Sequence, residues 1–83
     1  LVEAMERHRP GARPFIMSRA GFPGIQKYGA SVWSGDVSAS WTHLRRQPAI
    51  GLSMSLTGIP YWNSDIGGFN GTPSPELYVR WCQ

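Results

Sequence analysis

Three short apolar runs punctuate this chain, and a polar residue follows each of them. The runs cover residues 15–17, 31–33 and 59–62. None of them alternates apolar and polar side chains, and strands that lack this alternation are usually buried on both faces, as in parallel sheets. The pattern predicts an α/β fold with parallel strands, either a doubly wound sheet or a (β/α)8 barrel.

Helix-like stretches lie around these runs. Residues 1–9 resemble the end of a helix, and residues 39–56 form the best helix candidate. A further helix opens at Pro75, since proline suits the first helical position. Residues 20–30 and 66–75 are rich in glycine and proline, so we expect them to be loops.

Capping residues mark both ends of the long predicted helix, and a proline falls in its middle. Ser38 or Ser40 can cap its start by accepting a backbone N–H. Gly58 stands where a C-terminal cap is expected. Pro48 falls mid-helix, where it removes a donor and clashes with the carbonyl of Leu44, so we expect a kink or a split helix there.

Length and composition indicate a segment of a larger domain. The chain has 83 residues, of which only 16% are charged. A chain this short is marginal for a self-sufficient core. Both ends fall in helix-like stretches, so we expect residues 1–83 to be a fragment with much of its surface covered by other parts of the same protein.

Charge and cysteine content argue against several classes of function. The net charge is +3, and Arg7, Arg9 and Arg13 form its main cluster. A nucleic-acid footprint is one interpretation, but a solvated helix end and loop is the expected one, with no nucleic-acid partner.

Cys82 is the only cysteine, and no Cys/His spacing resembles a metal site, so neither metal nor cofactor is expected. No run approaches a membrane span, no membrane partner is expected, and the compartment stays open.

Three polar residues hold equivalent positions after the predicted strands. Arg19, Asp36 and Asp65 each follow one of them. In (β/α)8 barrels the active site forms at the C-terminal ends of the strands. Asp36 therefore has two interpretations, an ordinary turn or cap aspartate and a general acid. A general acid needs a carboxyl that keeps its proton near neutral pH, which burial or a nearby second carboxylate favours.

The neighbouring residues carry similar alternatives. Arg19 can form a structural salt bridge or grip a substrate hydroxyl, and Asp65 can be a turn residue or an acceptor for a substrate hydroxyl. Trp33 and Phe69 are core residues by default, but beside a carboxylate cluster their faces can stack on a sugar ring. His43 is expected on a helix face rather than in catalysis.

No nucleophile elbow, phosphate-binding loop or dinucleotide fingerprint is present. Asn70-Gly71-Thr72 matches the N-glycosylation triplet, although Asn-Gly is also a turn signal.

Together, the blocks around the strand ends resemble glycoside hydrolase family 31, which contains retaining α-glucosidases and α-xylosidases. The resemblance covers residues 13–83. Its blocks are Arg13–Arg19, Gly21–Gly24, Trp33–Asp36, Gly58–Trp62, Asp65–Phe69 and Pro75–Trp81. It implies that the chain supplies about three strand units of a (β/α)8 catalytic barrel, a fold of ~250 residues.

The resemblance also implies roles for individual residues. The family's acid/base falls on Asp36, and its substrate-hydroxyl contact falls on Arg19. Trp33 and Phe69 match aromatics that line the sugar subsite, and Asp65 matches an acidic residue of the same pocket. The partner would be an oligosaccharide or glycoside, cleaved with retention of configuration. Residues around Trp33 and Asp65 look somewhat closer to the α-xylosidase branch.

The resemblance has a limit. The family's nucleophile belongs to an upstream Trp-x-Asp block, and no such block occurs in these 83 residues. The isolated segment is therefore expected to be inactive. A sugar-binding homologue without catalysis is the alternative to a hydrolase.

Overall fold

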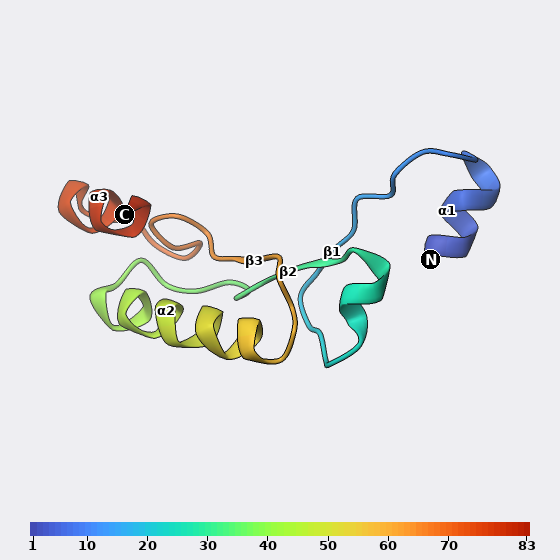
Figure 1. Cartoon of the computed structure of the whole chain (residues 1–83). Helices are drawn as coiled ribbons and strands as arrows, with labels where there is room; N and C mark the ends of the chain where they lie inside the picture. Colours follow the sequence, from blue (N-terminus) through green and yellow to red (C-terminus); the bar gives the residue numbers. More distant parts are fainter.

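The computed structural model describes residues 1–83 and contains three parallel strands with three α-helices (Figure 1). The α/β fold class is thereby confirmed. In chain order the elements are α1 Val2–His8, β1 Met17–Ser18, the short 3₁₀ helix η1 Ile25–Tyr28, β2 Ser31–Trp33, α2 Trp41–Leu56, β3 Trp62–Asn63 and α3 Pro75–Cys82.

The strands form one sheet in the order β1-β2-β3, and both pairs are parallel. Val32 of the central strand pairs with Ser18 on one side and Trp62 on the other. Its side chain is 1% exposed, so β2 has the two-faced burial that its apolar sequence predicts. Because neighbouring strands run in the same direction, their C-terminal ends lie at one edge of the sheet.

The two outer strands differ from the sequence prediction. β1 is Met17–Ser18 rather than residues 15–17, and Phe15, which lies before this strand, is 75% exposed. β3 begins only at Trp62, since Pro60 has no N–H and the N–H of Ile59 is donated to Met54 O at the end of α2.

Both ends of α2 are capped as the sequence predicts. Ser40 is the N-cap, and its Oγ accepts the N–H of His43 at 3.3 Å. At the other end Gly58 has φ +79°, a left-handed conformation that glycine adopts without strain. The N–H of Ile59 reaches back to Met54 O at 3.0 Å, the long-range bond of a Schellman motif.

Pro48 does not split this helix. One continuous helix runs from Trp41 to Leu56, with Pro48 exposed inside it (Figure 1). Of the two expected outcomes, a kink or a split, the split does not occur, because the caps at both ends and the remaining helical hydrogen bonds hold the helix together without the Pro48 donor. Packing adds support, since Gly51 lies directly against the indole ring of Trp62 in β3.

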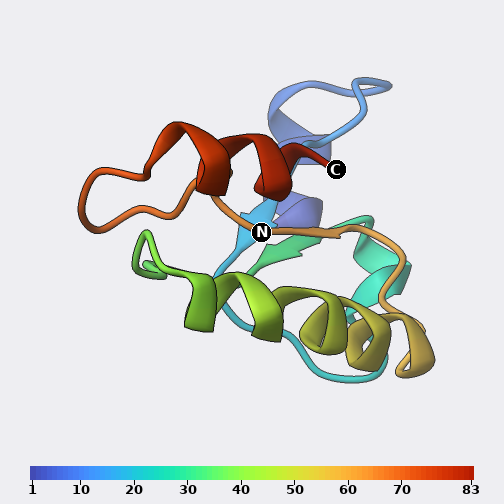
Figure 2. The same ribbon diagram turned by 90° about the vertical axis from the view of Figure 1, so that its left-hand side faces the viewer.

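The core of this segment is small. Its buried apolar residues are Ala30, Val32, Ile59, Leu77 and Trp81. Large apolar side chains stay exposed on α2, among them Leu56 at 89%. Figure 1 shows α2 running below the strands, α3 beyond their C-terminal ends and α1 on the opposite side, and Figure 2 shows α3 above α2 in the view from the α3 side. No helix has the length and apolar character needed to cross a membrane.

Candidate functional site at the strand ends

The C-terminal ends of the three strands place the predicted polar residues at one edge of the sheet. Arg19 directly follows β1, Asp36 lies three residues after β2, and Asp65 lies two residues after β3. The parallel order of the strands thus produces the arrangement that the sequence predicts. This edge, formed by Arg19, Asp36, Asp65 and the loops that carry them, is called the strand-end site below.

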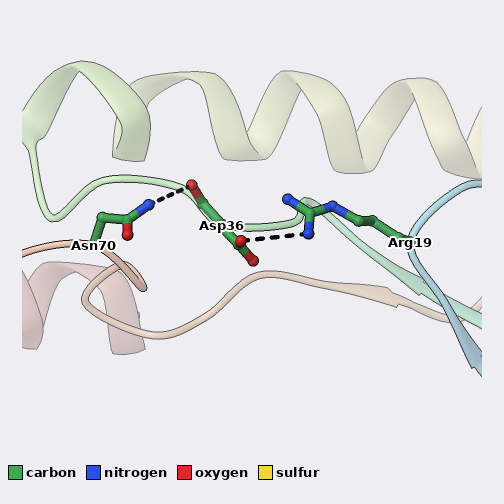
Figure 3. A network of polar contacts seen from close by, with 3 residues as sticks. All are labelled: Arg19, Asp36 and Asn70. Atoms are coloured by element: carbon green, nitrogen blue, oxygen red, sulfur yellow. Dashed lines mark hydrogen bonds and ion pairs between the residues drawn. The ribbon is translucent and has the colours of Figure 1, made fainter.

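Arg19 and Asp36 are in direct contact. Arg19 Nη1 donates to Asp36 Oδ2 at 3.3 Å (Figure 3). The side chains are 61% and 43% exposed, so solvent screens the pair and its contribution to stability is small, about 0–1 kcal/mol. The contact therefore matters for the placement of the two charged groups more than for stability.

Gly35 makes room for this ion pair. Its φ is +75°, and a Cβ added there would stand 3.1 Å from both Nε and Nη2 of Arg19. Only glycine adopts this backbone conformation at no cost while also leaving space for the guanidinium. Arg19 consequently lies across the backbone just before Asp36.

The loop after β3 is docked onto the segment that follows Asp36. Val37 O accepts the N–H groups of Phe69 and Asn70 at 2.7 and 3.0 Å, and Ala39 donates its N–H to Asn70 O at 2.8 Å. Gly68 allows this approach, because a Cβ there would lie 2.5 Å from Ala39 N. The two loops therefore form one backbone-bonded unit around the strand-end site.

Asp36 is also held through its own peptide group. Asn70 Nδ2 donates to Asp36 O at 3.0 Å, so Asp36 is contacted by Arg19 at its carboxylate and by Asn70 at its carbonyl (Figure 3). The glycosylation triplet and turn signal at Asn70 did not predict this contact. The bond joins residues 34 positions apart, and it depends on the docking of two loops.

The structure brings some of the predicted residues together and leaves others separate. Arg19 and Asp36 are paired, and Phe69 is tied to the segment after Asp36 through its backbone, with its ring 62% exposed. Trp33 ends β2 and is half-buried. Asp65 is also half-buried, and its carboxylate makes neither a hydrogen bond nor an ion pair to another side chain.

His43 has a defined role that the sequence interpretation missed. Its Nδ1 accepts the N–H of Ser38 at 2.9 Å, which ties the segment after Asp36 to the first turn of α2. The signal was the spacing: His43 stands three residues after the cap Ser40, the position from which a capping-box side chain reaches back.

No group of three His, Cys, Asp or Glu residues comes together in a way that could hold a metal ion. An apolar cavity of about 340 Å³ lies elsewhere, between α1, β1 and η1. The chemistry available at the strand-end site is that of a solvent-accessible carboxylate beside a guanidinium.

Comparisons with known proteins point to one family. The family description "Glycosyl hydrolases family 31 TIM-barrel domain" matches residues 1–83. The "Probable glucan 1,3-alpha-glucosidase" of Arabidopsis thaliana is 56% identical over 71 residues, which is 86% of this chain and 8% of that protein. The "Neutral alpha-glucosidase C" of Homo sapiens is 47% identical over 79 residues, 95% of this chain and 8% of that protein.

Solved structures agree with these relatives. A GH31 alpha-xylosidase from a soil metagenome, complexed with xylose, superposes with a TM-score of 0.86 at 41% identity, over 96% of this chain and 12% of that one. A glucosidase II alpha subunit gives a TM-score of 0.79 at 39% identity, over 88% of this chain and 8% of that one. The chain thus spans only a small part of the proteins that it matches, and over that part it belongs to the glycosyl hydrolases family 31 TIM-barrel domain.

Proposed function

We propose that residues 1–83 are part of the catalytic barrel of a retaining α-glycosidase and that Asp36 is its general acid/base. The observation that carries this proposal is the position of Asp36, three residues after β2 at the C-terminal edge of parallel strands. That edge is where (β/α)8 enzymes place their catalytic groups. The carboxylate is 43% exposed, so a substrate can reach it.

The mechanism is a double displacement. A carboxylate nucleophile attacks the anomeric carbon while Asp36 protonates the departing oxygen. Asp36 then takes a proton from water as that water attacks the glycosyl-enzyme, and the sugar leaves with its α configuration retained. The nucleophile comes from a part of the protein outside these 83 residues, and it should stand about 5–5.5 Å from the Asp36 carboxyl.

The other strand-end residues bind the sugar in this proposal. Arg19 exchanges part of its contact with Asp36 for a substrate hydroxyl, for which its planar set of donors is well suited. Asp65 accepts a hydrogen bond from a second hydroxyl, since its carboxylate has no partner within the chain. Trp33 and Phe69 present aromatic faces to the sugar ring, and the exposure of Phe69 is consistent with such a role.

For the substrate, we propose an α-glucoside first and an α-xyloside second. Relatives at 56% and 47% identity are named as α-glucosidases, whereas a solved α-xylosidase is 41% identical. The choice between the two sugars depends on space for one hydroxymethyl group. That space is shaped by more of the barrel than these strands, so the complete protein must be assayed with aryl glycosides of both sugars.

The proposal is tested with Asp36→Asn in the complete protein. General acid catalysis contributes roughly 10²–10⁴-fold, and a poor leaving group depends on it most. We expect kcat/KM to fall by that order for an alkyl or disaccharide substrate and much less for a dinitrophenyl glycoside. Glu6→Gln is the matched control, because it removes an exposed carboxylate of α1 that lies outside the strand-end site.

Equal kcat/KM losses for both leaving groups would contradict the role of Asp36. An unmodified protein that binds glycosides but turns over none of them would instead identify a sugar-binding homologue.

A further inference from the structure

We propose that Asn70 is a positioning residue that orients Asp36 for proton transfer by binding its peptide carbonyl. Asn70 Nδ2 donates to Asp36 O at 3.0 Å, although Asn70 belongs to the loop between β3 and α3 (Figure 3). This inference rests on the proposed function of Asp36. It adds a residue whose amide contacts the Asp36 carbonyl rather than the Asp36 carboxyl, and which therefore acts through the backbone.

The backbone around Asp36 needs such a restraint. Gly35, just before it, has φ +75° and has the widest choice of conformations of any residue type. The bond from Arg19 holds the carboxylate end, but that pair is exposed and Arg19 is long and flexible. The peptide group that joins Asp36 to Val37 is held at its N–H by Gly35 O, at 2.8 Å, and at its carbonyl by Asn70 Nδ2. The bond from Asn70 therefore completes the restraint on this peptide group, and hence on the direction in which the Asp36 side chain leaves the chain.

The hydrogen bond from the Asn70 side chain can be removed without removing the backbone hydrogen bonds that dock the two loops. The N–H of Asn70 and the N–H of Phe69 both go to Val37 O, and the N–H of Ala39 goes to Asn70 O. These backbone bonds do not depend on the residue type at position 70. Removing the amide should therefore leave the loop docked while it frees the carbonyl of Asp36.

The glycosylation triplet at Asn70 offers a competing explanation for this residue. A glycan would be attached to the same Nδ2 that contacts Asp36 O. Thr72 completes the triplet, and it is exposed. Thr72→Ala therefore abolishes the triplet and keeps the amide, which makes it the matched control.

The experiment uses Asn70→Ala and Asn70→Asp in the complete protein. Asn70→Asp is nearly isosteric but cannot donate, so it keeps the proposal testable if the alanine variant folds poorly. Displacements near 1 Å can lower a rate by about 10²-fold. We expect kcat/KM for a poor leaving group to fall about tenfold in both variants, within the range of general acid catalysis. Activity on a dinitrophenyl glycoside should change less than about twofold, because this leaving group needs little protonation.

A merely structural role would lower both activities equally, and that result overturns the proposal. So does unchanged activity in both Asn70 variants, or an equal loss in Thr72→Ala. Asp36→Asn, assayed alongside, separates the two proposals. If Asp36→Asn shows the leaving-group dependence and the Asn70 variants do not, only the role of Asn70 fails. If Asp36→Asn lacks it, the proposed function fails and the inference fails with it.

Discussion

The guanidinium of Arg19 lies against the backbone of Gly35, where a Cβ would stand 3.1 Å from two of its nitrogens. The contact joins the ends of β1 and β2 immediately before the carboxylate that we propose as the acid/base. Gly35 must keep a left-handed backbone conformation and must also leave room for the Arg19 guanidinium. Replacing Gly35 by alanine, which adds one methyl group, tests both requirements.

Gly35→Ala should lower activity as well as stability. A non-glycine residue at φ +75° costs about 1–2 kcal/mol, and the new methyl group must also push Arg19 aside. Gly11→Ala is the matched control, because Gly11 has φ +78° with nothing within 4 Å of its added Cβ. Both variants should lose similar stability in a urea titration, but only Gly35→Ala should raise KM. Equal KM values in the two variants would contradict the contact with Arg19.

A second close contact joins the long helix α2 to β3. A Cβ on Gly51 would lie 2.9 Å from two ring atoms of Trp62. Alanine should gain about 1 kcal/mol in helix propensity, but overpacking costs about 1–3 kcal/mol. We expect Gly51→Ala to lower the free energy of unfolding by about 1 kcal/mol, measured from the urea midpoint. Ser55→Ala, at an exposed position of the same helix, should have no such effect, and stabilisation by Gly51→Ala would show that Trp62 moves freely.

The predictions from sequence succeeded where the local pattern was sufficient. The caps Ser40 and Gly58 and the position of Asp36 after a strand depend on neighbouring residues, and the structure has them as expected. β3 was predicted too early, because the N–H of Ile59 completes the helix cap instead of the sheet ladder.

The contacts that were missed depend on tertiary docking. The bond from Asn70 to Asp36 spans 34 positions, and no local pattern marks it. Phe15 was expected in a buried strand, but it lies before β1 and is exposed. Burial of a side chain depends on what packs over it, which an apolar run alone does not reveal.

His43 provides a test of the segment that follows Asp36. Its Nδ1 accepts the Ser38 N–H at 2.9 Å, and a hydrogen bond of this kind contributes about 1 kcal/mol. In His43→Ala the amide of Ser38 should exchange with solvent about fivefold faster, as 1 kcal/mol of lost local stability implies. Hydrogen exchange of peptides covering residues 37–40 measures this effect. Unchanged exchange there would show that the segment does not need His43.

Ser64 and Trp81 connect the end of β3 to α3. Trp81 Nε1 donates to Ser64 Oγ at 2.8 Å, and the Trp81 side chain is buried. Ser64→Ala leaves the indole N–H without this partner, so we expect a loss of about 1–3 kcal/mol. A double-mutant cycle with Trp81→Phe, followed by urea unfolding, isolates the pairwise term. If the two losses in the free energy of unfolding are fully additive, the hydrogen bond between Trp81 and Ser64 does not contribute to stability.

The stereochemistry of azide rescue tests the proposed role of Asp36 most directly. In Asp36→Ala, a substrate with a good leaving group should still form the glycosyl-enzyme, and azide should attack it without base assistance. We expect azide to restore turnover and the product to be the α-glycosyl azide, identified by NMR. If azide instead yields the β-glycosyl azide, Asp36 is the nucleophile and not the acid/base. If Asp36→Ala hydrolyses the substrate at an unchanged rate without azide, Asp36 takes no part in the reaction.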